Sequence, residues 1–273
     1  MSRPSTFAVF RWEVRRLRSQ KRTYLGLGAA VAVPVIFCVA VALQPGGPED
    51  VPFGRYIQDT GLAIPLVLLL FGSIWLFPLI TALVAGDIVA TEDQNGTLKT
   101  ILTRSVERSQ VFTAKVLAAF GYAVVAILLT GTTALVAGIA VSGFNPVPDL
   151  SGQTVPANDA LRLVLASLAV YLMPILTVAC IALLLSTVTR NSAAAVVGTL
   201  MFSLLLQLLT IVPGLEGVRP YLLSSQFDSW QGLLRSPIDW DPIVRAAWVC
   251  SLYGIPSLLV ALTVFLRRDV TGG

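Results

Sequence analysis

The chain has 273 residues, of which 55% are hydrophobic and 12% are charged, and its mean hydropathy is +0.80. Soluble chains carry about 25% charged residues, so this composition excludes an ordinary soluble domain. The sequence has no histidine, which excludes a histidine metal site and a Ser-His-Asp triad. Cys38, Cys180 and Cys250 lie far apart in apolar runs, so we interpret them as small hydrophobic residues of packed helices.

Apolar runs of about 20 residues predict six membrane-spanning helices, because a helix of that length crosses a hydrocarbon core of about 30 Å. The predicted spans are residues 24–43, 61–85, 116–141, 161–185, 193–212 and 243–266. We therefore expect an all-α membrane protein in which residues 1–273 form a single transmembrane domain. No stretch between spans is long enough for a separate core. An even number of spans places both termini on one side.

The basic residues indicate which side that is. Of the 19 lysines and arginines, the loops opposite the termini hold only Arg55, Arg162, Arg219, Arg235 and Arg245. The positive-inside rule therefore predicts that both termini are cytoplasmic. The net charge of +4 reflects this topology and does not indicate a nucleic-acid partner.

The leader, residues 1–23, combines two stripes of helical spacing. The apolar stripe is Phe7, Phe10, Val14 and Leu17, and the basic stripe is Arg11, Arg15, Arg18 and Arg22. This pattern predicts an amphipathic helix on the inner membrane surface, with its arginines facing anionic lipid. A basic leader that only sets the topology is the alternative. A cleaved signal peptide is disfavoured, because the first apolar run is too long.

The loop after the second span, residues 86–115, is too long for a simple connection. Residues 87–94 can continue the second helix out of the membrane, and Asn95-Gly96 can break it. Thr97 can then cap a short helix, and Ser109 can cap the third span. The short helix has one apolar face, made of Leu98, Ile101 and Leu102. Such a face indicates a docking surface for a partner or a helix lying in the lipid interface.

All acidic and basic residues fall at span ends or in loops. Charged groups inside a membrane mark ion pathways and proton relays, so an ion-driven carrier is not indicated. The chain also lacks a G-x-x-x-x-G-K-[ST] nucleotide loop. Candidate substrate-path residues, which serve equally well as packing or lipid-facing residues, are Phe71, Trp75, Tyr171, Phe202 and Gln207.

Several features bear on helix geometry. Prolines inside the spans predict kinks, which are either ordinary or part of a rearrangement during transport. Ala134, Gly138 and Ser142 have the spacing that allows close helix contact. The outer segment, residues 213–242, mixes apolar and polar side chains and could gate the outer mouth or cap the helices.

The stretch from Glu92 to Lys115 resembles the loop of ABC-2 type transporter permeases. It contains Glu92, the run Gly96-Thr97-Leu98, an apolar pair, a turn at residues 104–108, and Lys115 opening the next span. The family often has proline in that turn, where this chain has Ser105 or Val106. Residues 186–192 look like the family's short turn between spans four and five. The six-span layout matches along the full length.

The resemblance implies a transport subunit, not an enzyme, in a bacterial cytoplasmic membrane. It would export a hydrophobic or amphipathic compound such as a drug, lipid or natural product. Its expected partners are a second permease copy, identical or closely related, and two copies of a separate ABC ATPase, which would bind ATP and Mg. Membrane lipids would contact the leader, and this chain would hold no cofactor. The expected ATPase contacts are Glu92, Gly96, Thr97, Leu98, Ile101, Leu102, Arg104 and Arg108.

Two other function classes stay open. A non-transporting scaffold or immunity protein would give no substrate-dependent stimulation of an ATPase. A lipid-modifying enzyme would need a carboxylate cluster or a nucleophile with its base. Asp87, Glu92 and Asp93 form the only dense acidic group in the sequence, and a role at a helix end explains them better.

Overall fold

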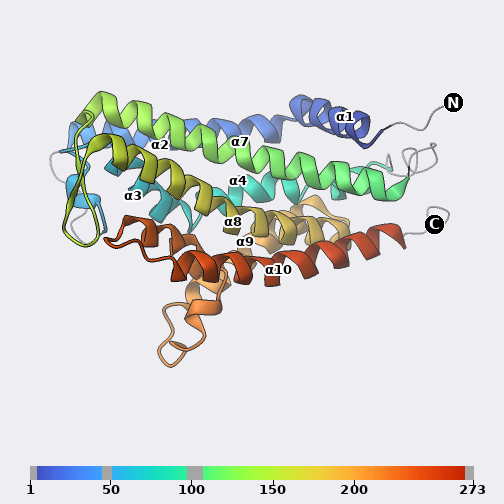
Figure 1. Cartoon of the computed structure of the whole chain (residues 1–273). Coiled ribbons are helices and arrows are strands. Elements are labelled where there is room, and N and C mark those ends of the chain that lie inside the picture. Colours follow the sequence, from blue (N-terminus) through green and yellow to red (C-terminus); the bar gives the residue numbers. More distant parts are fainter. Residues whose placement is uncertain (1–4, 45–50, 97–106, 268–273) are drawn as a thin grey trace.

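The computed structural model describes residues 5–44, 51–96 and 107–267, which form an elongated bundle of helices (Figure 1). The first half contains α1 (Thr6–Ser19), α2 (Lys21–Leu43), η1 (Gly54–Tyr56), α3 (Ala63–Gly72), α4 (Leu76–Ala85), α5 (Ala90–Gln94) and α7 (Arg108–Ser142). The second half contains α8 (Ala157–Thr189), α9 (Ser192–Leu209), η2 (Arg219–Tyr221), η3 (Ser224–Leu234) and α10 (Asp241–Leu266). Between α7 and α8, β1 (Val147–Pro148) pairs antiparallel with β2 (Thr154–Val155).

Among the described residues, five helices are long and apolar enough to cross a membrane: α2, α7, α8, α9 and α10. They correspond to five of the six predicted spans, and the all-α membrane class is confirmed. The N-terminal end of α1 and the C-terminal end of α10 lie at the same end of the bundle (Figure 1). We call this end, which the basic residues assign to the cytoplasm, the inner end. The opposite end is the outer end.

The second predicted span, residues 61–85, is not one straight helix. It consists of α3 and α4, which are bent by 62° at the break between Gly72 and Leu76. Pro78 lies near the start of α4, and its ring would clash with the carbonyl of Ile74 if the helix were continuous. The aromatic ring of Phe77 fills the corner, since a Cβ on Gly72 would lie 2.5 Å from it. The described residues thus contain five long helices, or six spans if this bent pair counts as one.

The helix boundaries at the inner end also differ from the prediction. The third long helix begins at Arg108 with Glu107 as its N-cap residue, so the prediction that Ser109 caps it is wrong. Helix α8 continues to Thr189, which leaves a turn of Arg190 and Asn191, shorter than the predicted turn of residues 186–192. The Asn191 side chain accepts a hydrogen bond from the Ala194 N–H at 3.1 Å and caps α9. The predicted tight hairpin of α8 and α9 is confirmed.

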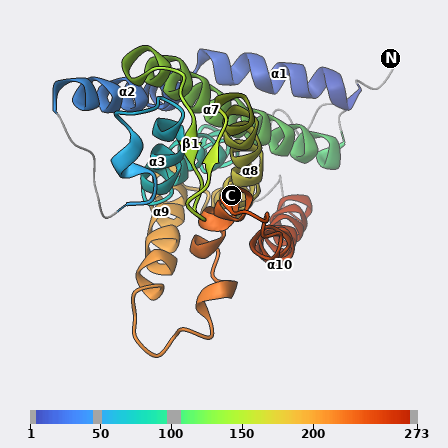
Figure 2. The same cartoon turned by 60° about the vertical axis from the view of Figure 1, so that its left-hand side comes forward.

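The leader forms α1 as predicted, but it packs along the inner part of α7 (Figures 1 and 2). Its apolar stripe is buried at Leu17, which is 6% exposed, while Phe7 is 67% exposed. Trp12, which lies off the apolar stripe, has the Arg16 guanidinium 5.9 Å from its ring centroid. Arg22 was expected in the basic stripe of the leader. It belongs to α2 instead, because the backbone turns to an extended conformation at Gln20.

The bundle has two hydrophobic clusters. The inner cluster joins α1, α2, α4, α7, α8 and α10. The outer cluster is built mainly from α3, α7, α8 and η3, with further residues of α2, α4, α9 and α10. In the outer cluster Trp230 of η3 is fully buried, so the outer segment does cap the helices. The predicted close contact at Gly138 is confirmed, because a Cβ there would lie 2.6 Å from the Gly61 carbonyl oxygen.

Candidate functional site

Residues 86–94, which leave α4 towards the long loop, are held by the neighbouring helix α8. The backbone N–H groups of Val89 and Ala90 both donate to the Ser186 hydroxyl, at 3.3 and 3.0 Å. The first N–H groups of a helix have no acceptor within the helix itself. The Ser186 hydroxyl of α8 provides that acceptor for α5. The start of α5 is therefore fixed against α8.

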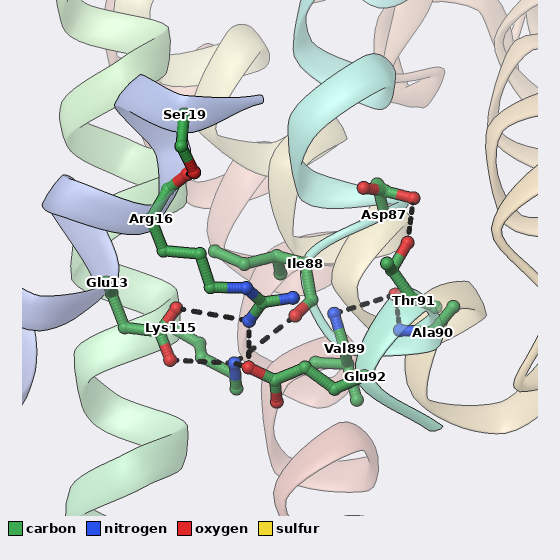
Figure 3. Close-up of polar contacts among 11 residues, drawn as sticks. Glu13, Arg16, Ser19, Asp87, Ile88, Val89, Ala90, Thr91, Glu92 and Lys115 are labelled. Atoms are coloured by element: carbon green, nitrogen blue, oxygen red, sulfur yellow. Dashed lines mark hydrogen bonds and ion pairs between the residues drawn. The ribbon is translucent and has the colours of Figure 1, made fainter. Parts of the chain in front are cut away.

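Four charged side chains meet beside α5 (Figure 3). Glu13 and Arg16 come from α1, Glu92 comes from α5, and Lys115 comes from α7; we call them the ion-pair cluster. Lys115 Nζ lies 2.7 Å from Glu13 Oε1, 2.6 Å from Glu92 Oε1 and 3.2 Å from the Ile88 carbonyl oxygen. The Arg16 guanidinium pairs with Glu92 and lies 3.7 Å from Glu13 Oε2. Two carboxylates are thus balanced by two cations.

Three of the four members of the ion-pair cluster are closed to solvent, while the Arg16 side chain is 20% exposed. Glu13 and Lys115 are 0% exposed and Glu92 is 1% exposed. An ammonium group has three N–H donors, and Lys115 has three acceptors within hydrogen-bond distance. Removing one member of a buried ion pair leaves its partner uncompensated and costs about 3–5 kcal/mol. The cluster therefore fixes α1, α5 and α7 relative to one another.

A second group of polar residues, which we call the Asp87 cluster, lies nearby. The Asp87 carboxylate is 3% exposed and accepts hydrogen bonds from Arg22 of α2, Thr91 of α5 and Ser192 of α9. Arg22 also donates to the Ser192 hydroxyl. Hydrogen bonds to a charged group contribute about 1.5–3 kcal/mol each. The Asp87 cluster therefore ties residues 86–94 to α2 and α9.

The two clusters, with Ser186, connect residues 86–94 to five helices: α1, α2, α7, α8 and α9. The far end of the long loop is held as well, because Arg108 Nη1 donates to the Leu266 carbonyl oxygen at the end of α10, at 2.9 Å. Such contacts can transmit a displacement of the loop to the membrane helices. Each acid of residues 86–94 also faces a base, including Asp93, whose Oδ2 lies 3.7 Å from Arg190 Nε. These acids are therefore structural charges.

A comparison with protein families identifies the family of this chain. The profile of the ABC-2 family transporter proteins matches residues 9–206, more than half of the chain. The chain belongs to the ABC-2 transporter family. The matched region contains both clusters and the whole long loop, whereas η3 and α10 lie beyond it. A search of the curated proteins found no match.

Membership in this family makes the chain a multi-pass membrane permease that works with an ATP-binding subunit. The resemblance drawn from the loop motif is therefore confirmed at the level of the family. The clusters of this permease lie at the end of the bundle where the long loop leaves α5 and enters α7.

The expected ATPase contacts of the permease lie partly within the described residues. Glu92 was expected to face the ATPase, but its buried carboxylate contacts Lys115 and Arg16 of the same chain. Gly96 has a φ of 66°, a left-handed conformation that suits glycine, and it follows the end of α5. Arg108 contacts α10. The remaining expected contacts, which lie outside the described residues and stay predictions, are Thr97, Leu98, Ile101, Leu102 and Arg104.

The expected membrane-surface residues of the leader lie on the outside of α1. Phe10 is half-buried, while Phe7, Arg11, Arg15 and Arg18 are exposed. Contact of these side chains with lipid stays a prediction.

The expected substrate-path residues do not share one environment. Phe71 and Trp75, at the break between α3 and α4, are 46% and 59% exposed. Tyr171 is fully buried, and its hydroxyl donates to the Leu69 carbonyl oxygen at 2.8 Å. Phe202 packs against Tyr253 of α10, with ring centroids 6.5 Å apart. Gln207 lies on α9, near the break. Tyr171 thus packs the core in this conformation.

Sequence reasoning missed Glu13 and the structural role of Lys115. Two signals could have found them. Glu13 is the one acid in the basic leader, and it lies at helical spacing between Phe10 and Leu17. Lys115 is one of three lysines in the chain and stands at the start of an apolar span. A lone acid and a lone lysine on two buried faces are expected to pair.

Proposed function

We propose that this permease forms, with a second permease copy, the path for export of a hydrophobic or amphipathic compound across a bacterial cytoplasmic membrane. The energy comes from two copies of a separate ABC ATPase that binds ATP and Mg. The observation that carries the proposal is the attachment of residues 86–94 to five helices through the ion-pair cluster, the Asp87 cluster and Ser186. The family membership of the chain supports the ATPase partner.

The mechanism follows from the rigidity of these attachments. When the ATPase moves the loop, α5 moves with it, because α5 is short and Glu92 and Asp87 are bound on either side of its first turn. Lys115 then passes the displacement to α7, and Glu13 passes it to α1. Packed elements respond as units and not by continuous deformation. A movement at the inner end is thus converted into a movement of whole helices.

The alternatives lack comparable support. A lipid-modifying enzyme would use Asp87, Glu92 and Asp93, but each of these acids is paired with a base. A non-transporting scaffold makes no use of the attachments between the loop base and the membrane helices. It remains an outcome of the following test.

The test is purification of the tagged chain from its native host under mild conditions, with identification of the proteins that accompany it. We expect an ABC ATPase in stoichiometric amount. The double substitution Leu98→Asp and Ile101→Asp should abolish this association, because it places charge on the predicted apolar face. The control is Thr100→Asp, which adds a single negative charge on the side of the predicted helix away from that face and should leave the association intact.

Three results would count against the proposal. A chain that is repeatedly purified alone and folded favours a scaffold or an enzyme. Association that survives the double substitution removes the loop from the interface. An associated ATPase whose activity responds to no amphipathic compound favours the scaffold.

A further inference from the structure

The outer half of the permease contains a narrow cleft at the break between α3 and α4, which we call the outer cleft. Side chains from the break, α8, α9 and η3 line it. Half of these side chains are polar: Ser73, Ser203, Gln207 and Ser224. The interior of the cleft has a volume of about 10 Å³, which is about the space that a single water molecule needs. It can therefore take the tip of a head group, such as an ammonium, and not a whole amphiphile.

The polar side chains of the outer cleft present hydrogen-bond acceptors. Each serine hydroxyl donates its proton to a backbone carbonyl oxygen. Ser73 donates to Leu70 at 2.7 Å, Ser203 to Thr199 at 3.0 Å, and Ser224 to Leu206 at 2.9 Å. A hydroxyl oxygen that has donated its proton still has lone pairs to accept with. The Gln207 amide adds a further acceptor through its oxygen, and its NH2 group can donate. A ligand that uses the serine oxygens must therefore supply donors.

A carboxylate lies at the edge of the same cleft. With three residues per turn in a 3₁₀ helix, Ser224 and Phe227 of η3 share the stripe that lines the cleft. The adjacent stripe of η3 is Ser225, Asp228 and Gln231, and these three are the residues of η3 that are not buried. Phe227, which precedes Asp228, packs against Tyr171 of α8 with ring centroids 5.2 Å apart. Asp228 is thus next to the cleft wall.

Within the part of the chain that the structure describes, Asp228 has no base at ion-pair distance, in contrast to Asp159 and Asp239. Asp159 pairs with Arg162 at 3.2 Å and Asp239 pairs with Arg235 at 3.4 Å. Within the described ranges no lysine or arginine lies within ion-pair distance of Asp228, which accepts one hydrogen bond from the Gln231 amide at 3.2 Å. The Asp228 side chain is exposed on one side, but desolvation by the protein around it raises the pKa of its carboxyl, while the Gln231 bond acts in the opposite direction. A cation at this position would stabilise the charged form.

We propose that the outer cleft binds the protonated amine of a cationic amphiphile, with Asp228 as its counter-ion. The cleft oxygens accept hydrogen bonds from the N–H groups of the ammonium, and the hydrocarbon part stays outside the cleft. This inference rests on the proposed transport function and adds a substrate class to it.

The test is binding of dodecylamine to the purified full-length chain in lipid nanodiscs, measured by quenching of tryptophan fluorescence. Dodecanol and dodecanoate are the neutral and anionic probes of equal chain length, and partition into empty nanodiscs is subtracted. We expect dodecylamine to bind most tightly and Asp228→Asn to weaken it about tenfold, since a hydrogen-bonded charge contributes at least that much. Binding of dodecanol should not change.

Three variants complete the design. Asp228→Glu keeps the charge and should retain most of the dodecylamine affinity, which separates the loss of charge from a loss of folding. Gln207→Leu removes an acceptor on another element and should weaken dodecylamine binding severalfold. Asp159→Asn removes an exposed outer carboxylate on α8, already paired with Arg162, and should change nothing.

The proposal is overturned if dodecylamine and dodecanoate bind equally, or if Asp228→Asn binds dodecylamine as the unchanged chain does. An equal loss in Asp159→Asn overturns it too. The binding assay contains no ATPase, so the two proposals fail separately. If no ATPase accompanies the chain but Asp228 still selects the amine, the transport proposal fails and the site stands.

Discussion

The inner ion-pair cluster and the outer cleft both place polar groups among apolar helices, but they satisfy them differently. At the inner end Lys115 has three acceptors, and two carboxylates face two cations. At the outer cleft the serines are satisfied by backbone carbonyls of nearby residues, and Asp228 has no base within the described part of the chain. Matched charges hold elements in place, whereas a carboxylate without a cation and oxygens with spare lone pairs can receive a ligand.

The largest effect is expected from Lys115→Met. This substitution leaves the buried carboxylates of Glu13 and Glu92 with Arg16 as the remaining cation, so the free energy of unfolding should fall by about 3–5 kcal/mol. Unfolding in mixed micelles containing sodium dodecyl sulfate measures it. Lys21→Met, at an exposed position of α2, should stay within about 0.5 kcal/mol of the unchanged chain. Equal stability of both variants would mean that the ion-pair cluster does not hold the inner end.

A smaller loss is expected from Asp87→Asn. The amide keeps the shape but loses the charge that accepts from Arg22, Thr91 and Ser192. The free energy of unfolding should fall by about 1.5–3 kcal/mol in the same micelle titration. Asp59→Asn, at an exposed outer position, is the control and should have little effect. A loss as large as that of Lys115→Met would show that the two clusters act as one unit.

The smallest effect on stability is expected from Ser203→Ala in the outer cleft. Its hydroxyl donates to Thr199 within the same helix, and such a bond adds little to a helix that is already formed. The free energy of unfolding should therefore change by at most about 0.5 kcal/mol, while dodecylamine binding should weaken because one acceptor is lost. A large loss of stability would place Ser203 with the structural residues of the inner end and remove the contrast between the two regions.

Much of the molecule follows from the sequence alone. The length and hydropathy of the apolar runs determined five long helices and the all-α membrane class, because any helix that crosses a hydrocarbon core needs about 20 apolar residues. The long loop carried the residues that resemble the ABC-2 permeases, and the family assignment confirmed that resemblance. Periodicity also placed α1, although it did not show which neighbour covers its buried face.

The tertiary structure decided which residues far apart in the chain pair with one another. Glu13 meets Lys115 and Arg22 meets Asp87 because α1, α2 and α7 pack beside residues 86–94. The sequence placed these charges at span ends but held no signal of their partners, since a pairing depends on how helices pack and not on local spacing. The same holds for Asp228. Its place on η3 beside the α3–α4 break exists only once that 3₁₀ helix is buried between α8 and α10.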